Sequence, residues 1–570
     1  MPIRMERAEY NRRYGATADD RIRLADTNLF ARVERDDTLP GFEPLAGFGR
    51  PMRDGMLFGR SGWNGRTSAS QLDLVITNAI IMDPVLGIFR SNIGIKDGRI
   101  AGIGRAGNPD VTDDIELLIG SATGLIAADG AIVTPGGVDT HVHLSSSSII
   151  GAAAYSGITT LVGQGSGGVW DLGVNPLSNM LHVFEAFEAV PMNLAVLARG
   201  SSDRAELKTA FEVGASGLKI HEDVGAFPSV IDACLSIADL AGGQVAIHTD
   251  GLNEAGALAE TIAAIAGRSI HAYHVEGSGG GHAPNLIEIC SDPRIIGSST
   301  NPTLPWSVNS VAEQLEMIIT VHRLDRNNPE DMAAARDRVR ASTIAAEDIL
   351  HDLGAIAIVS SDSQGMGRIG EVISRTWQLA HHMKTVRGGG FDPATNEGDD
   401  NPRILQYLAK YTINAAIAHG LDHEVGSLEP GKLADLVIWQ PAFFGAKPTA
   451  VIKGGFVSAA QVGDGQGSTR GSQPLIYRPM WGGMGLAPAQ LAVNFVSRYA
   501  ASGIPRGGHL RRRPVAVRNV RTTFKSDMLH NAASPRIEVD PTTHEVLING
   551  EAVNNPPAES LPLGQRYFLA

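Results

Sequence analysis

An eightfold alternation of short apolar runs with longer helix-like stretches, between residues 134 and 422, is the feature that most constrains the fold. Ala-, Leu- and Glu-rich segments, such as 205–214 and 229–242, lie between neighbouring runs. Strand–helix alternation at this spacing predicts a parallel sheet, and eight units favour closure into a (β/α)8 barrel of the TIM type. The runs are 136–144, 158–163, 192–198, 215–223, 243–250, 269–277, 294–301 and 355–363.

An open doubly wound sheet is the alternative that the same alternation allows. No GxGxxG follows the first apolar run, and no GxxxxGK[ST] occurs anywhere in the chain. These glycine-rich loops are the ones that hold dinucleotides and nucleotide phosphates. The sequence therefore carries no dinucleotide-binding or P-loop signature.

The segments on either side of the barrel region are β-rich. Short β-type runs broken by Gly, Pro and Asp fill the first part of the chain, and Asp97-Gly98 between two of them is a strong hairpin signal. The same pattern of short β-type runs recurs in 424–439 and 449–463. We predict an N-terminal β-rich domain, the barrel, a return to the β-rich domain and a C-terminal extension. Their bounds are 1–133, 134–422, 423–480 and 481–570.

Composition limits the class of protein. A chain of 570 residues is too long for one compact core, and 43% apolar with 19% charged residues is an ordinary globular balance. The net charge of -13 argues against a nucleic-acid-binding surface. Two cysteines, Cys234 and Cys290, suit a reducing cytosol, and no secretory signal or roughly 18-residue apolar span is visible. We expect a cytoplasmic enzyme without a membrane or nucleic-acid partner.

Metal-binding residue types fall at the ends of the predicted strands. His141 and His143 are two residues apart, so both face the same side of the first strand. His248, His274 and Asp362 lie at the ends of the fifth, sixth and eighth strands, where a barrel places its active site. Imidazole with carboxylate suits Zn, Ni, Mn or Fe, and no cysteine lies nearby.

The fourth strand ends with Lys219, His221 and Asp223 on one face. A lysine beside metal ligands needs an explanation, because a buried cation near divalent cations is costly. Two explanations remove the charge: the amine is neutral, or it carries CO2 as a carbamate. A carbamate is an anion whose two oxygens can bridge two metals.

The barrel region contains long distinctive motifs, which are GGVDTHVH, GLKIHEDVGA, VAIHTDGLNEAG, YHVEGSGGGHAPN, SSTNPTLPWSVN, TIAAEDILHDLGA, SSDSQGMGR and GEVISRTWQLAHHMK. RLADTNLF lies near the start of the chain, and GQRYFLA lies at its end. These motifs strongly resemble the α (catalytic) subunit of bacterial ureases, and the resemblance covers essentially the whole chain. VGSLEPGKLADLV (425–437) is also typical of the wider amidohydrolase superfamily.

The resemblance implies two nickel ions per chain, bridged by a carbamate that CO2 forms on Lys219. Residue types alone equally allow zinc or manganese. Three further side chains would hold one ion, and two would hold the other. The first set is His141, His143 and Asp362, and the second is His248 and His274.

The resemblance also implies roles around the metals. His221 and the backbone at Gly279 would orient the substrate carbonyl. His322 matches a histidine of a mobile flap that acts as general acid, and Asp223 and Arg338 match the residues that support it.

The activity implied is hydrolysis of a linear amide, urea, to ammonia and carbamate by attack of a metal-bound hydroxide. The implied partners are small urease β and γ subunits in a trimer of heterotrimers, and accessory proteins that insert nickel and CO2.

The chain departs from the urease pattern around the barrel mouth. The cysteine that usually precedes the flap histidine is Val321, and the residue after that histidine is Arg323. LSSSS (144–148) replaces an aromatic and Cys-Pro segment, and the loop 163–176 is shorter. These changes favour an alternative, a urease paralogue acting on another small amide, a substituted urea or a cyclic ureide. A catalytically idle scaffold subunit is a third hypothesis, which the complete set of ligands disfavours.

Overall fold

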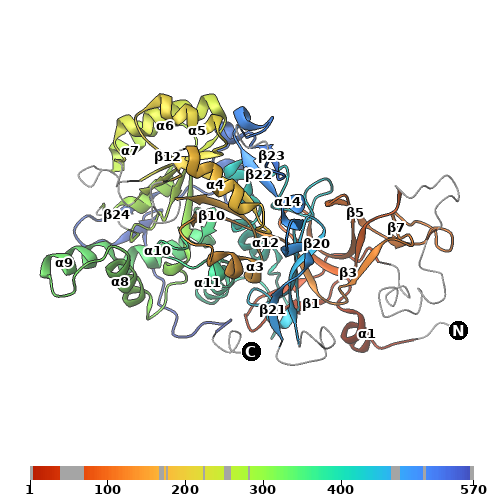
Figure 1. Cartoon of the computed structure of the whole chain (residues 1–570). Coiled ribbons are helices and arrows are strands. Elements are labelled where there is room, and N and C mark those ends of the chain that lie inside the picture. The colour runs from red at the N-terminus through yellow and green to blue at the C-terminus, as the bar shows by residue number, and fades with distance from the viewer. Residues whose placement is uncertain are drawn as a thin grey trace.

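The computed structural model describes residues 4–38, 59, 70–165, 173–174, 177–221, 225–249, 258–279, 283–463, 475–504 and 509–564. Two large sheets organise this part of the chain, a parallel barrel and a mainly antiparallel sheet beside it (Figure 1). The fold is therefore mixed α/β.

Eight parallel strands form the barrel in simple sequence order. Each predicted run coincides with one of them, although β11 and β12 each extend one residue beyond the run, so the prediction of eight strands is confirmed. The strands are β10 (Gly137–His143), β11 (Ile158–Gln164), β12 (Asn193–Arg199), β13 (Gly217–Ile220), β14 (Gln244–His248), β15 (Ile270–Tyr273), β16 (Ile295–Thr300) and β17 (Ile358–Ser360).

The first and last strands meet just beyond the end of β17. The backbone N–H of Asp362 donates to the carbonyl of His141 at 2.9 Å, and the N–H of His143 donates to the carbonyl of Ser363 at 3.0 Å. Val142 and Ser363 form a parallel bridge between these bonds. The sheet is thus a nearly closed barrel, and the open doubly wound alternative is wrong.

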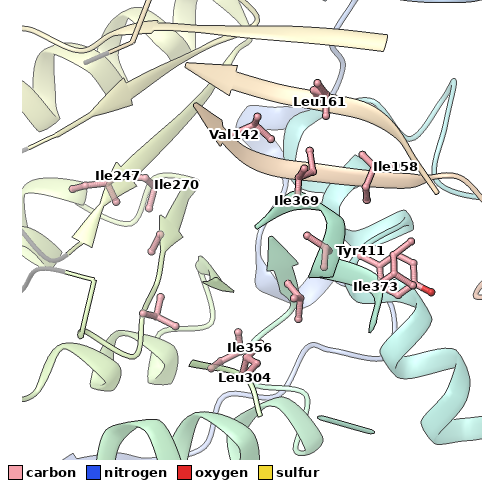
Figure 2. Packing of buried hydrophobic residues seen from close by; sticks show 14 of the residues in the cluster. Val142, Ile158, Leu161, Ile247, Ile270, Leu304, Ile356, Ile369, Ile373 and Tyr411 are labelled. Atoms are coloured by element: carbon pink, nitrogen blue, oxygen red, sulfur yellow. The ribbon is translucent and has the colours of Figure 1, made fainter. Parts of the chain in front are cut away.

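Alternation along each strand separates two apolar layers. Inward-facing residues such as Val162 and Tyr273 form a cluster inside the barrel. Outward-facing residues, including Leu161 and Ile247, pack against the surrounding helices in a larger cluster, part of which is shown in Figure 2. Among the helices that follow barrel strands in sequence are α3 (Ile149–Ser156), α4 (Leu177–Phe187), α5 (Arg204–Glu212), α6 (Pro228–Ala241), α7 (Leu258–Ile265), α10 (Ala341–Asp352), α11 (Val372–Arg387), α12 (Asn401–Lys410) and α13 (Ile413–His419).

Helix α6 shows why these sequences form helices. Proline at its first position needs no N–H partner, and Gly242, at φ 78°, ends it in the left-handed conformation. Its buried residues, Val230, Ile231, Cys234 and Ala238 among them, recur at helical spacing. No helix in the described ranges combines the length and apolar character needed to cross a membrane.

The second sheet draws its strands from both flanks of the barrel, as predicted. β18 pairs antiparallel with β9, which joins the returning chain to the N-terminal part. Asp97 and Gly98, at φ 50° and 73°, form the expected tight turn between β4 and β5. The strands are β3 (Leu74–Asp83), β4 (Gly87–Lys96), β5 (Arg99–Gly104), β8 (Gly124–Ala127), β9 (Ile132–Pro135), β18 (Leu436–Trp439), β19 (Pro448–Lys453), β20 (Phe456–Val462) and β21 (Ile476–Pro479).

The C-terminal extension contributes to the barrel sheet. β22 (Val493–Val496) pairs parallel with the first half of β12 and with β23 (Arg513–Ala516), an addition that the sequence did not predict. Within the extension, β24 (Ile537–Val539) pairs antiparallel with β25 (Val546–Ile548). The extension is thus packed onto the barrel.

Candidate metal centre

The six proposed metal ligands come together at the carboxyl ends of the barrel strands. Each is nearly or fully removed from solvent, with His248 the most exposed at 6%. They come from five different barrel strands or from the residues just after them. The six side chains are His141, His143, Lys219, His248, His274 and Asp362.

Three of these side chains converge closely. Oδ1 of Asp362 lies 2.8 Å from Nε2 of His143 and 3.2 Å from Nε2 of His141, and the two imidazole nitrogens are 3.3 Å apart. Metal–ligand bonds of about 2.0–2.1 Å at tetrahedral angles place neighbouring ligand atoms about 3.3 Å apart. The three atoms therefore have the spacing of one face of a metal site.

The other histidines lie beside this trio. The ring centroids of His248 and His274 are 4.3 Å apart, and those of His141 and His274 are 5.3 Å apart. His274 also offers a ligand atom within 4.8 Å of ligand atoms of His141 and Asp362. Nζ of Lys219 lies 3.4 Å from Nε2 of His141, which places the amine next to the trio.

The electrostatics of the cluster suit cation binding by neutral imidazoles. Burial, followed by the positive charge of Lys219, holds the pKa of His141 well below its ordinary value of 6.5. A neutral imidazole is the form that binds a metal. The donor set of imidazole and carboxylate, its spacing and its protonation thus fit a divalent metal ion.

Two residues that the sequence analysis missed hold the ligands in place. Oδ1 of Asp139 accepts hydrogen bonds from the N–H groups of His141, at 3.1 Å, and Ser361, at 3.0 Å. Tyr273 stacks against His141, with ring centroids 3.9 Å apart, and donates its hydroxyl to the carbonyl of Thr140. Asp139 lies two residues before His141 and so shares its face, a signal that sequence alone offers.

Two of the proposed ligands have an unusual backbone conformation. His274 has φ 31° and Asp362 has φ 59°, in the left-handed region that residues other than glycine rarely adopt. Such conformations persist only where the surrounding structure fixes them, and they concentrate at functional sites. At Asp362, the N–H bond to the carbonyl of His141 supplies part of that constraint.

The residues proposed to act on the substrate lie in different surroundings. His221 follows β13, and its ring lies 4.1 Å from that of His248, centroid to centroid. Gly279 is buried in the segment after β15. Asp223 lies outside the described residues, so its placement stays a prediction. The structure therefore brings His221 to the metal ligands.

The proposed flap consists of two helices. His322 is the half-buried C-cap of α8 (Ser310–Val321), and Arg338 is the buried last residue of α9 (Pro329–Arg338). Val321 packs in an apolar cluster that includes Met366, four residues after Asp362. The two helices thus pack on the loop that follows the Asp362 ligand.

The serine-rich loop after β10 is tied to the loop after β17. Oε1 of Gln364 accepts hydrogen bonds from the N–H groups of Ser145, at 3.1 Å, and Ser146, at 2.7 Å. A hollow of about 480 Å³ lies between the two loops, and Ser148 and Arg368 are among its lining residues. Most of the shortened loop 163–176 lies outside the described residues.

A nearly closed parallel barrel with ligand-type side chains at its mouth defines a class, the barrel hydrolases that work with divalent metals. The model of the Amidohydrolase family matches residues 132–468, more than half of the chain. This chain belongs to the amidohydrolase family. The model of the urease alpha-subunit N-terminal domain matches residues 3–126, ahead of the barrel.

Solved structures with a similar arrangement include three enzymes. An N-acyl-D-glutamate deacylase from Bordetella bronchiseptica is 18% identical, with a TM-score of 0.45, over 68% of this chain and 96% of that one. A dihydropyrimidinase from Brevibacillus agri is 16% identical, with a TM-score of 0.48, over 67% and 94%. The L-hydantoinase from Arthrobacter aurescens is 16% identical, with a TM-score of 0.46, over 75% and 100%. At these values nothing about activity follows from the similarities.

Proposed function

We propose that this amidohydrolase cleaves urea to ammonia and carbamate with two divalent metal ions, nickel by resemblance to ureases. The convergence of five metal-ligand side chains with Lys219 in one buried cluster is the observation that carries the proposal. The match of residues 3–126 to the urease alpha-subunit N-terminal domain favours urea over other amides. Under this proposal His141, His143 and Asp362 hold one ion, and His248 and His274 hold the other.

A pair of bound divalent ions polarises a substrate carbonyl and activates water at neutral pH. The chain supplies the remaining chemistry. His221, whose ring lies beside His248, donates a hydrogen bond to the substrate oxygen as negative charge develops on it. The backbone at Gly279 holds the substrate from the neighbouring segment.

Lys219 acts as a carbamate in this proposal. Its side chain is completely buried, and its Nζ lies 3.4 Å from an imidazole nitrogen and 4.2 Å from the centroid of the Tyr273 ring. A protonated amine there repels any cation that the histidines hold. Addition of CO2 to the neutral amine, with loss of a proton, would give a carbamate anion able to help hold both ions, which would remove the conflict.

His322 supplies the proton that the leaving amine needs. An amine leaves poorly unless it is protonated, and an imidazole titrates near neutral pH, which suits a general acid. The helices that carry His322 and Arg338 pack on the loop after Asp362. Arg338 and Asp223 orient His322.

A paralogue acting on another small amide, a substituted urea or a cyclic ureide is the second candidate. The serine-rich loop tied to Gln364 lies at the barrel mouth, where residues that contact the rest of a substrate are expected. Val321 and Arg323 flank the proposed acid. These positions change what surrounds the substrate and leave the ligand set intact.

The partners follow from the same proposal. We expect small urease β and γ subunits in a trimer of heterotrimers, nickel-insertion accessory proteins and a cytoplasmic location. Co-expression with and without such chains, followed by size measurement, tests the assembly; a fully active lone monomer contradicts it.

The decisive test is hydrolysis by protein matured with nickel and bicarbonate. Purified protein is assayed for ammonia release from urea, biuret and acetamide, and for ring opening of dihydrouracil, which releases no ammonia, with His221→Ala as the matched inactive variant. Urea turnover that the substitution lowers at least about 100-fold supports the urease proposal. Turnover of another compound of the panel, but not of urea, favours the paralogue. If fully metallated protein hydrolyses none of the compounds, the hypothesis of a catalytically idle scaffold subunit is favoured.

A further inference from the structure

The glutamine at the tip of the second barrel strand plays no part in the site described so far. Gln164 is the last residue of β11, and its Cα pairs in register with that of His143 on β10. Its carbonyl accepts the N–H of Leu144 at 2.8 Å, which fixes the backbone beside the metal ligand. The whole residue is buried, with 0% exposure.

The side chain of Gln164 faces the barrel interior. Val162, two residues earlier on the same strand, belongs to the interior cluster with Tyr273 and Leu197. Residues two apart on a strand share a face, so Gln164 points the same way, one layer nearer the mouth. His143, its partner in register, faces the interior as well. The carboxamide therefore lies on the wall of the metal site.

The carboxamide of Gln164 has no hydrogen-bond partner within the described ranges, at either Oε1 or Nε2. Gln244, the first residue of β14, is also 0% exposed, but its Nε2 donates to the carbonyl of Ala418 and its Oε1 accepts from the N–H of Val245. Buried amide groups normally form hydrogen bonds. An amide without a partner beside a reaction centre is therefore a candidate for hydrogen bonding to a ligand.

We infer that Gln164 is a specificity-determining residue that pairs with a second amide group of the substrate; the inference rests on the proposed hydrolysis at the metal centre. A carboxamide presents one acceptor and one donor side by side. Once the carbonyl of urea faces the metals, its free amino group offers hydrogen-bond donors only. Nε2 of Gln164, itself a donor, then has no acceptor. An acylurea, such as biuret, has a second carbonyl next to an N–H and satisfies both atoms. Gln164 thus offers an acylated urea a contact that urea lacks, whereas the contacts with the metal centre are common to both substrates.

Replacement of Gln164 by methionine tests the inference, because methionine keeps the volume and removes both polar atoms. In the metal-loaded protein we expect Gln164→Met to lower kcat/KM for biuret by about 10- to 100-fold, mainly through KM, and that for urea by less than about threefold. Its thermal midpoint without substrate should stay level or rise. Gln244→Met, the matched buried control, should lower the midpoint because it removes formed hydrogen bonds. Equal losses on both substrates, or a lower midpoint for Gln164→Met, overturn the inference.

A binding measurement separates this inference from the proposed function. Biuret should raise the thermal midpoint of the metal-loaded wild-type protein and not that of Gln164→Met. If biuret binds in this way but no substrate is hydrolysed, the proposed hydrolysis fails and the recognition by Gln164 stands. If biuret shifts both proteins equally or neither of them, Gln164 does not recognise the second amide. A crystal structure with biuret away from Gln164 and water on its amide overturns the inference as well.

Discussion

Oδ1 of Asp362, just after the last strand of the barrel, lies 2.8 Å from Nε2 of His143, at the end of the first strand. The backbone bonds that join β10 to the segment after β17 produce this approach, since the N–H of Asp362 donates to His141. Closure of the barrel and assembly of the candidate metal centre are therefore one structural event.

The activity of the protein should resist thiol reagents, because the proposed flap carries no cysteine beside His322. Burial raises the pKa of both Cys234 and Cys290 to about 12, so almost no thiolate exists at pH 8. We expect iodoacetamide to leave wild-type activity unchanged and to inactivate Val321→Cys, whose new thiol is half-buried beside His322. Activity and peptide mass after alkylation at pH 8 check this.

The unfolded wild-type chain, in which both cysteines should be modified, is the control for that experiment. Modification of Cys234 in the folded wild type, or full activity of alkylated Val321→Cys, would show that the assignment of these thiols is wrong.

A buried ion pair at the second sheet is hydrogen-bonded to the barrel. Nζ of Lys453 on β19 lies 2.7 Å from Oδ2 of Asp435 and donates to Oδ1 of Asn193 on β12 at 2.7 Å. Loss of one partner of a buried pair typically costs about 3–5 kcal/mol, because the other charge remains buried. Lys453→Met should lower the free energy of unfolding by about that amount, measured by denaturant titration.

The control for that substitution is Lys96→Met, at an exposed ion pair with Asp73, for which about 0–1 kcal/mol is expected. Similar losses for both lysines would mean that the buried pair does not hold the sheets together.

The stability of the fold should fall with rising pH because of Asp348. Burial raises the pKa of Asp348 to about 8, although its carboxylate accepts the N–H of Trp306 at 2.9 Å. Because the folded pKa lies above the unfolded value of about 4, folding favours the protonated acid. That contribution is complete below about pH 4 and is lost as the pH rises to about 8.

Asp348→Asn does not titrate, so the wild type should lose stability relative to it across this window, by at most about 1.4 kcal/mol per pH unit. Unfolding free energies at several pH values measure the difference. Asp114→Asn, at a side chain that is 81% exposed, serves as the control. A constant gap between wild type and Asp348→Asn from pH 4 to 8 would contradict the raised pKa.

The barrel and the convergence of the proposed ligands at its mouth were predictable from sequence because both depend on local patterns. Apolar runs at even spacing mark the strands, and histidines two apart must share a face. The family membership now rests on residues 132–468, and the domain boundaries stay predictions.

Other features depend on contacts between distant segments and left no local signal. β22 joins β12 across almost 300 residues of chain, and no pattern in 481–570 indicates that partner. The left-handed backbone of His274 and Asp362 is set by the loops around them. Gln164 could be singled out only from the structure, in which its buried amide has no hydrogen-bond partner among the described residues.

The metal content of wild type and Lys219→Ala tests the central claim most directly. The full chain, matured with nickel and bicarbonate, is analysed for metals per chain, with Lys208→Ala, at a 61% exposed lysine, as the control. The account predicts about two metal ions in the wild type and the control, and fewer than one in Lys219→Ala. Two ions retained by Lys219→Ala, or none bound by the wild type, would contradict it.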